Sequence, residues 1–174
     1  MMEGFEAMAE HWRDRVNTFG YYTLGNREDA EDVSQDVMLR LWEHWSELAP
    51  RDATGWIIRV ARNACLDRLR RRRTRREALV AHGETIDVEL SSHAANNPDT
   101  LFEVRERHER VQRALQSIEE PYRTILILRD IQDRSCAEIA QALDMTPNAV
   151  RVRSHRGRRM LREELKKDSP HDTI

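Results

Sequence analysis

The chain has 174 residues, of which 34% are charged and 39% hydrophobic, and its formal net charge is −2. This length allows one ordinary domain or two small ones, and the sequence has neither an apolar run of membrane-spanning length nor a signal-peptide core. Cys65 and Cys136 lie far apart, without a CxxC motif or a Cys/His cluster, so no disulfide framework is indicated. We therefore expect a cytoplasmic protein with no membrane insertion, no metal and no other cofactor.

The near-neutral total conceals two basic segments. Residues 51–80 carry 10 Lys/Arg against 3 Asp/Glu, a net of +7, and residues 123–174 carry 11 against 8, a net of +3. Residues 1–50 (4 against 11) and 81–122 (4 against 9) are acidic, with nets of −7 and −5. A polyanion responds to local patches rather than to the total charge. Two basic blocks therefore favour two contacts with nucleic acid.

Helical spacing of apolar residues dominates the first half of the chain, with no alternating strand pattern. Three helices are predicted here, at about 3–24, 28–48 and 53–76, with a break at Gly25-Asn26 and with Pro50 closing the second helix. Residues 80–98 are rich in Gly, Ser, Asn and acidic residues and lack a helical stripe, which is typical of a linker.

The helical period returns at Asp99. Four more helices are predicted, at about 99–118, 121–131, 135–143 and 146–167. Ser135 and Glu138 form a capping box at the start of the third of these, and Thr146 is an N-cap followed by proline at the first helical position. A short helix, a tight turn and a basic helix are the outline of a helix-turn-helix, whose second helix enters the major groove.

The last predicted helix is the candidate recognition helix, since residues 145–167 hold 8 Lys/Arg and 2 Asp/Glu, a net of +6. Val150, Gly157 and Leu161 share a face that should pack inward. The side chains placed to reach base edges are Asn148, Arg151, Val152 and His155, and those placed for phosphates are Arg153, Arg156 and Arg158. A solvated basic helix is the plainer interpretation, but the two capped helix starts favour DNA binding.

Two earlier helices carry weaker signals. In the third helix, Trp56 and an outward set of Arg59, Arg62, Asn63 and Arg70 are suited to stacking and hydrogen-bonding an unpaired base. A core position for Trp56 is an equally good interpretation, and the arginine run is also consistent with a generic polyanion patch. The second helix has an acidic outer face that suits protein docking, although charge alone favours an ordinary solvated face.

Three stretches resemble the extracytoplasmic-function (ECF) sigma factors, the smallest group of the sigma-70 family. Region 2.2 of that family is similar to GNREDAEDVSQDVMLRLWEHW, regions 2.3 and 2.4 are similar to TGWIIRVARNACLDRLRRRRTR, and region 4 is similar to EEPYRTILILRDIQDRSCAEIAQALDMTPNAVRVRSHRGRRMLREEL. The resemblance implies an all-α fold with two small helical domains. These are a region 2 bundle (1–79) and a region 4 helix-turn-helix domain (99–168), joined by a flexible linker (80–98) and followed by a tail (169–174).

The same resemblance implies a sigma factor, not an enzyme, that binds core RNA polymerase and directs promoter-specific initiation. Region 2 would bind the clamp coiled coil of the largest subunit through Asp32, Gln35, Asp36 and Arg40. It would open the −10 element through Arg51, Asp52, Trp56, Arg59, Arg62, Asn63, Arg70 and Arg71. Region 4 would bind the flap of the second-largest subunit, and the −35 element through Ser135, Thr146, Asn148, Arg151, Val152, Arg153, His155, Arg156 and Arg158. An anti-sigma factor is an expected further partner.

The sequence departs from the family pattern within the recognition helix. Ser154 stands where the family usually has Leu, Val152 where it often has Ser, and Gly157 where it often has Ala. Glycine inside a helix costs up to about 1 kcal/mol relative to alanine. These departures concern the −35 readout rather than the fold.

Two other functions are compatible with parts of the sequence. A helix-turn-helix regulator with a sensory N-terminal half would explain residues 120–167, but it would leave the second and third helices without a role. A small helical enzyme is disfavoured, because no catalytic or metal-binding constellation stands out at a plausible spacing.

Overall fold

The computed structural model describes residues 2–48, 50–81 and 100–167, with side chains described for 4–48, 52–81 and 104–167. These residues form helices and no strand, which confirms the all-α class. The elements are α1 (Met2–Leu24), α2 (Arg27–His44), α3 (Pro50–Ala81), α4 (Thr100–Gln116), α5 (Tyr122–Leu126), the π-helical turn η1 (Ile127–Ile131), α6 (Cys136–Leu143) and α7 (Pro147–Lys167). None of the described helices has both the length and the apolarity needed to cross a membrane.

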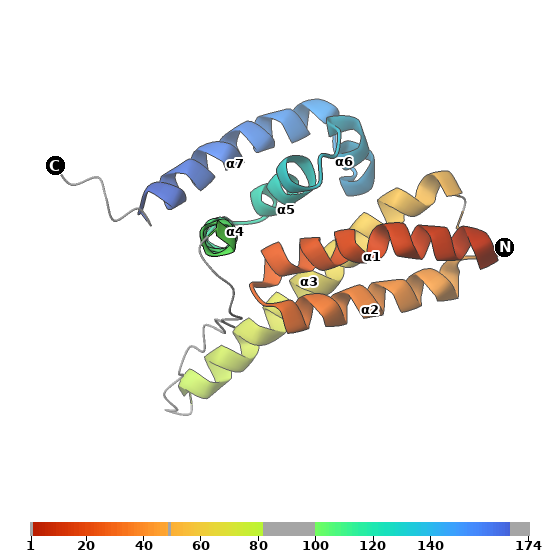
Figure 1. Ribbon diagram of the computed structural model, residues 1–174, viewed down its shortest axis with the longest axis horizontal. Coiled ribbons are helices and arrows are strands. Elements are labelled where there is room, and N and C mark those ends of the chain that lie inside the picture. The colour runs from red at the N-terminus through yellow and green to blue at the C-terminus, as the bar shows by residue number, and fades with distance from the viewer. Residues whose placement is uncertain (1, 49, 82–99, 168–174) are drawn as a thin grey trace.

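Helices α1, α2 and α3 form the first group and lie side by side in Figure 1. Gly25 ends α1 with a φ of +86°, a conformation that glycine adopts at little cost. Asn26 then caps α2, its Oδ1 accepting a hydrogen bond from the Asp29 amide at 2.8 Å. The buried residues of this group come from all three helices and include Trp12, Val16, Val33, Val37, Leu41, Ile57 and Cys65.

The ends of α2 and α3 differ from the sequence prediction. Helix α2 ends at His44 and is followed by a turn, so the predicted end near residue 48 is wrong. Pro50 begins α3 instead of closing α2, in keeping with the preference of proline for the first turn of a helix. Helix α3 continues to Ala81 rather than ending near residue 76. An i,i+4 pair between Arg73 and Glu77 supports this extension. The rest of the predicted linker lies outside the described residues.

Helices α4 to α7 form the second group, and its local signals agree with the sequence. Ser135 Oγ accepts a hydrogen bond from the Glu138 amide at 3.2 Å, and Glu138 accepts one from the Ser135 amide at 2.9 Å, which confirms the capping box. Asp144 ends α6 in the left-handed conformation, and Thr146 Oγ1 accepts a hydrogen bond from the Ala149 amide at 3.1 Å. The predicted helix-turn-helix is therefore present as α6, a tight turn and α7.

The continuous helix predicted over residues 121–131 is instead α5 followed by the π-helical turn η1. The four successive residues Ile125–Leu128 are all buried. A helical segment that is apolar on every side needs neighbours on every side. Those neighbours come from both groups of helices.

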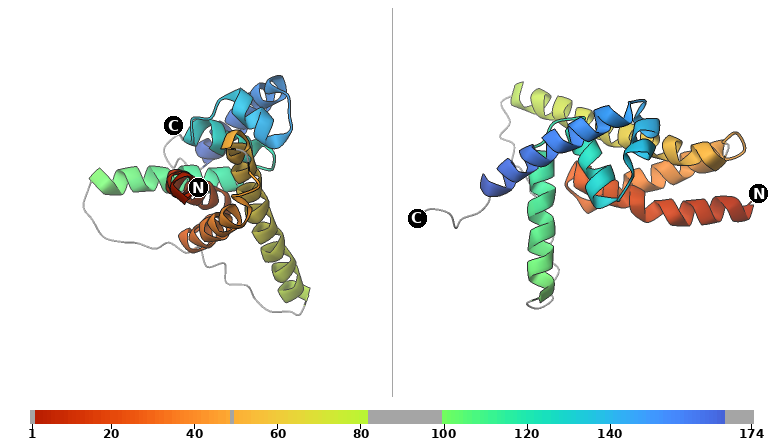
Figure 2. Two further views of the ribbon diagram at one scale, coloured as in Figure 1. Left: turned by 90° about the vertical axis from the view of Figure 1, so that its right-hand side faces the viewer. Right: turned by 90° about the horizontal axis from the view of Figure 1, so that it is seen from above.

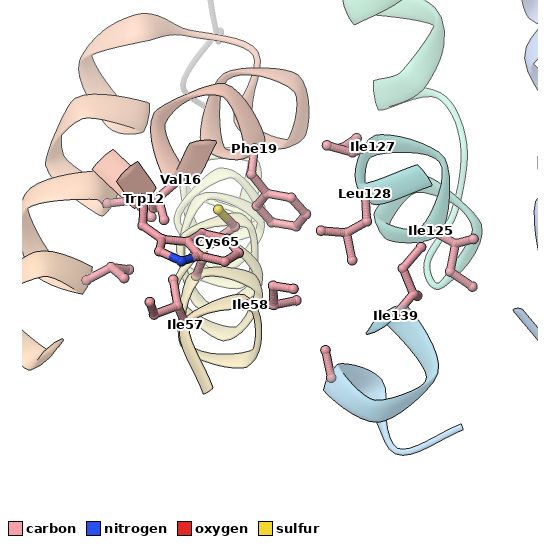
Figure 3. Close-up of a cluster of buried hydrophobic side chains, with 14 of the residues drawn as sticks. Trp12, Val16, Phe19, Ile57, Ile58, Cys65, Ile125, Ile127, Leu128 and Ile139 are labelled. Atoms are coloured by element: carbon pink, nitrogen blue, oxygen red, sulfur yellow. The ribbon is translucent and has the colours of Figure 1, made fainter. Parts of the chain in front are cut away.

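The two groups share one hydrophobic core. Phe19 of α1 and Ile58 of α3 lie on one side of the contact, and Leu128 of η1 lies opposite them, as Figure 3 shows. Helix α3 also contacts α6, and the turn after α1 meets the end of α4, where Gln116 lies against Gly25. Figure 2 shows that α4 projects across the first group rather than running along it.

Candidate functional site

The outward face of α7 carries the predicted base-reading side chains. Asn148, Arg151 and His155 are exposed, and Val152 is 42% exposed. Val150, on the opposite face, is fully buried. The structure therefore separates a packing face from a polar, basic face as the periodicity predicted. Contact between that face and −35 DNA remains a prediction.

The position of α7 depends on two small residues on its inner face. A Cβ atom at Gly157 would lie 3.1 to 3.3 Å from three side-chain atoms of Leu126, so α7 and α5 approach closely there. Ser154 is buried, and its Oγ makes no hydrogen bond within the described residues. The two inner-face departures from the family pattern thus sit where α7 packs on its own domain. The third departure, Val152, lies on the outer face.

The arginines of α7 predicted to bind phosphate differ in their surroundings. Arg156 is exposed, whereas Arg153 is half-buried with its Nη1 3.1 Å from Met145 Sδ. Arg158 donates two hydrogen bonds to Asp130, at 3.0 and 2.5 Å, and these bonds raise the pKa of Arg158. A DNA phosphate would therefore have to compete with Asp130 for Arg158.

Ser135 and Thr146 lie exposed at the N-termini of the two helix-turn-helix helices. Their hydroxyl oxygens already accept backbone amide hydrogen bonds. Hydrogen bonds from Ser135 and then Arg134 hold the pKa of Glu138 below its usual range. The capping groups are thus engaged in shaping the motif, and each hydroxyl keeps a hydrogen to donate to a phosphate oxygen.

The predicted −10 face of α3 brings an aromatic ring beside polar side chains. Trp56 is half-buried, packs against the core and lies with its ring centroid 5.6 Å from that of His44. Arg59 and Asn63 follow at steps of three and four residues and are exposed, so the three share a face. The Nε of Arg62 is buried without a hydrogen bond in the described structure.

The other predicted −10 residues lie away from this group. Asp52 is exposed near the start of α3, and the side chain of Arg51 lies outside the described residues. Arg71 is exposed, and Arg70 pairs with Asp67 at 3.1 Å. The structure therefore gathers Trp56, Arg59 and Asn63 and leaves the remainder spread along the helix.

The acidic face of α2 is partly neutralised by α3. Arg68 Nη1 lies 2.6 Å from Asp29 and 3.3 Å from Asp32, and Arg68 Nη2 lies 3.9 Å from Asp36. Arg72 also pairs with Asp29 and donates a hydrogen bond to the Leu24 carbonyl at 2.8 Å. Asp32 and Asp36 remain exposed, and both also pair with Arg68 of α3. Sequence reasoning gave Arg68 no role.

Two exposed apolar residues beside this acidic face were also missed. Leu39 is 62% exposed and Trp42 is 54% exposed, although both belong to a helix that otherwise packs well. The ring of Phe5 meets Trp42 edge to face, with centroids 4.9 Å apart. The signal was present in the sequence, because Leu39 and Trp42 fall off the inward stripe of Val33, Val37 and Leu41. Apolar side chains among charged ones mark a surface for protein association.

Cys65 is a buried packing residue rather than a reactive thiol. Burial raises the pKa of Cys65 to about 12, so its thiol stays protonated and serves as a packing group. Among the described residues, no cluster of His, Cys, Asp and Glu is arranged to hold a metal ion.

Comparison with known proteins agrees with this arrangement. Residues 8–75 match the family model for sigma-70 region 2, and residues 108–161 match that for sigma-70 region 4. The chain is 32% identical over 169 residues to the ECF RNA polymerase sigma factor SigE of Mycolicibacterium smegmatis, covering 97% of this chain and 64% of the relative. It thus spans less than two thirds of that relative's length. It is 25% identical to the ECF sigma factor SigW of Bacillus subtilis, covering 94% of this chain and 90% of SigW.

Two solved structures share the fold at 19% sequence identity. The sigma factor RpoE from Bartonella quintana, in complex with the anti-sigma factor NepR, superposes with a TM-score of 0.67 over 95% of this chain and 98% of that chain. CnrH, in complex with the cytosolic domain of CnrY, superposes with a TM-score of 0.68 over 97% of this chain and 92% of that chain. Both likenesses extend across the two groups of helices.

Proposed function

The chain belongs to the extracytoplasmic-function group of the sigma-70 family, and we propose that it is a sigma factor directing core RNA polymerase to promoters. The proposal rests on one observation. The same chain presents two outward basic faces and one acidic, partly apolar face. The basic faces belong to α3 and α7, and the third belongs to α2. The protein acts as an initiation factor in the cytoplasm and catalyses no reaction of its own.

Region 4 binds the −35 element through α7. The N-terminal half of a recognition helix lies closest to the base edges in the major groove. Arg151 is exposed there and can pair bidentately with guanine, while His155 lies one turn further along the same face. Arg156 is exposed beside them and contacts phosphate, which fixes the position of the helix on the DNA.

Region 2 captures an unpaired base of the −10 element on α3. Trp56 is half-buried and offers the exposed part of its ring for stacking, and Arg59 and Asn63 offer hydrogen-bond donors on the same face of the helix. These groups act on a base only after the two strands have separated. They therefore stabilise the open promoter rather than the first encounter.

Polymerase docks on α2. Asp32, Gln35, Asp36 and Arg40 form an exposed polar row, and Leu39 and Trp42 add apolar surface next to it. An apolar centre with a charged rim is the usual composition of a specific protein interface. The partner surface on polymerase is the clamp coiled coil of its largest subunit, and region 4 contacts the flap of the second-largest subunit.

An anti-sigma factor is a further proposed partner. Of the solved structures that share the fold, RpoE is bound to the anti-sigma factor NepR, and CnrH is bound to the cytosolic domain of CnrY. A helix-turn-helix regulator that acts without replacing a sigma factor is less well supported, because it gives no role to the faces of α2 and α3.

The test is in vitro transcription with purified core polymerase on a library of promoters. We expect the protein to co-elute with core polymerase as a monomer and to activate a subset of promoters that share −10 and −35 sequences. The matched control is Leu39→Asp combined with Trp42→Asp, which should abolish co-elution while leaving the helical circular dichroism spectrum unchanged. Failure of the unaltered protein both to bind polymerase and to activate any promoter would overturn the proposal.

A further inference from the structure

His44, the last residue of α2, lies against the tryptophan that is proposed to stack a −10 base. The centroids of the His44 and Trp56 rings are 5.6 Å apart, and the two ring planes are inclined by 40°. This separation lies within the range over which aromatic rings attract one another. His44 is exposed and Trp56 is half-buried, so the two rings meet at the protein surface rather than within the core.

A hydrogen bond fixes the orientation of the His44 ring. The Nδ1 atom of His44 lies 2.9 Å from the carbonyl oxygen of Arg40, one turn earlier in α2. A carbonyl oxygen can only accept, so Nδ1 donates in this contact. The His44 side chain therefore turns back over the preceding turn of α2, which is the usual direction for a helical side chain. The imidazole is thus held by the backbone of α2 while it contacts the ring of Trp56.

Trp56 is contacted on its other side by the hydrophobic core. An indole that is held by the core alone can still turn about its two side-chain torsions. Ordering such a side chain when a ligand binds costs free energy, and a ring that is already ordered avoids part of that cost. Contacts with the core and with His44 therefore prepare the Trp56 ring for stacking before any base arrives.

We propose that His44 is a positioning residue for Trp56, whose imidazole holds the indole in the orientation that receives an unpaired base of the −10 element. This inference rests on the proposed sigma-factor function. His44 acts through Trp56 and makes no contact of its own with the base. The proposal also gives α2, the helix proposed to dock polymerase, a part in recognising the −10 element.

A double-mutant cycle tests whether His44 acts through Trp56. The variants are His44→Ala, Trp56→Ala and the combination of the two. Each is assembled with core polymerase on a promoter that the unaltered protein activates, and permanganate footprinting measures the fraction of promoter that is open. His44→Ala should lower this fraction by about threefold to tenfold when Trp56 is present. In the Trp56→Ala background it should lower the fraction by less than about twofold, because residues that act through one another are not additive.

Two results of the cycle would overturn the proposal. One is an equal effect of His44→Ala in both backgrounds, which would mean that His44 acts independently of Trp56. The other is an unchanged open fraction in Trp56→Ala, which would mean that no base stacks on this ring. Trp56→Leu keeps an apolar side chain against the core, and it replaces Trp56→Ala if that variant has a lower melting temperature.

Two further substitutions separate the ring of His44 from its hydrogen bond. His44→Phe keeps an aromatic ring beside Trp56, and His44→Gln keeps a hydrogen-bond donor for the Arg40 carbonyl. Positioning by the ring predicts that His44→Phe keeps the open fraction within about twofold of the unaltered protein, whereas His44→Gln behaves like His44→Ala. A residue that only stabilised the end of α2 would give the reverse order, and that order would contradict the proposal.

A second histidine provides the matched control. His11 is also exposed, and its ring centroid lies 5.9 Å from that of Trp12, but Trp12 is buried and belongs to α1. His11→Ala should leave promoter opening unchanged. An equal loss of opening in His11→Ala and His44→Ala would show that the effect is not specific to Trp56 and would overturn the proposal.

Co-elution with core polymerase distinguishes positioning from docking. It should be unchanged in His44→Ala, and its loss would place His44 in the polymerase interface instead of beside the −10 base. If the unaltered protein neither binds polymerase nor activates any promoter, the proposed sigma-factor function is wrong and the inference fails with it. If the unaltered protein activates promoters and the cycle is additive, only the role of His44 is wrong.

Discussion

Helices α3 and α7 are both strongly basic, yet they use their arginines differently. On α3, Arg68, Arg70, Arg72 and Arg73 each have a carboxylate partner within the same region. On α7, Arg151 and Arg156 are exposed, and no carboxylate in the described part of the chain pairs with them. Two of these arginines, Arg68 and Arg72, join α3 to the neighbouring helices, and the other two pair within α3 itself. Counting arginines overstates the share of α3 that is available to DNA.

Paired and unpaired arginines on α3 should differ in how much their substitution by alanine lowers the stability of the protein. Arg68→Ala should lower the free energy of unfolding by about 1–2 kcal/mol, because Asp32 and Asp36 then lose their cation and Asp29 keeps only Arg72. Arg71→Ala, three residues further on, should change stability by less than about 0.5 kcal/mol. Urea denaturation followed by circular dichroism measures both. Equal stability of the two variants would remove the structural role assigned to Arg68.

On α7, the exposed arginines should act on DNA rather than on stability. Arg151→Ala should change which base is preferred in the −35 element, at a cost of roughly 1–3 kcal/mol in binding. The measurement is the binding of −35 duplexes with single-base changes by polymerase carrying this protein. If affinity falls uniformly while the base preference persists, Arg151 contacts phosphate, and base reading moves to Asn148 and Val152.

The aromatic face of α3 should act later than α7. Trp56→Ala and Asn63→Ala should damage promoter opening more than closed-complex binding, since stacking a base on an aromatic ring contributes about 1–3 kcal/mol only after the strands part. Permanganate footprinting on duplex and pre-melted promoters separates the two steps. A variant that a pre-melted template fails to rescue has a different role. Because Trp56 also packs against the core, the folding of the Trp56→Ala variant is checked by circular dichroism in parallel.

Some arginines of α7 are paired like those of α3: Arg158 pairs with Asp130, and Arg159 lies 3.8 Å from Glu163. The two hydrogen bonds of Arg158 to Asp130 should leave little of its charge for phosphate. Arg158→Ala should therefore reduce the salt dependence of DNA binding by less than the roughly 0.9 units of slope expected for one phosphate contact. Asp130→Asn should release Arg158 and steepen the slope. If both substitutions leave the slope unchanged, Arg158 does not approach the DNA backbone.

The features that local sequence encodes were predictable, and those that depend on distant partners were not. The caps at Ser135 and Thr146 follow from hydroxyl groups that bond within three residues. Pro50 was misassigned because proline both follows helices and begins them, and only packing decides between the two. The acidic row of α2 looked like a simple outer face, because its cation, Arg68, lies more than thirty residues away in sequence.

The contact between the two regions was also beyond sequence reasoning. The apolar stripes showed that each helix has an inner face, but not that Phe19 and Leu128 would share a core. The burial of all four residues Ile125–Leu128 was the available signal. A segment that is apolar all round needs more cover than its own small domain provides.

Gly157 sets how closely α7 packs against α5. Helix α7 contacts Leu126 at Gly157. About ten residues, or about 15 Å, separate this contact from the start of the helix at Pro147. A methyl group at residue 157 would lift the helix by a few tenths of an ångström, and a tilt of three degrees about that point would move Pro147 by about 0.8 Å. Such a displacement is large for a hydrogen bond to a base edge, whose donor–acceptor distance varies over about 0.5 Å. The position of the N-terminal half of α7 thus depends on Gly157, a residue buried in the middle of the helix against Leu126.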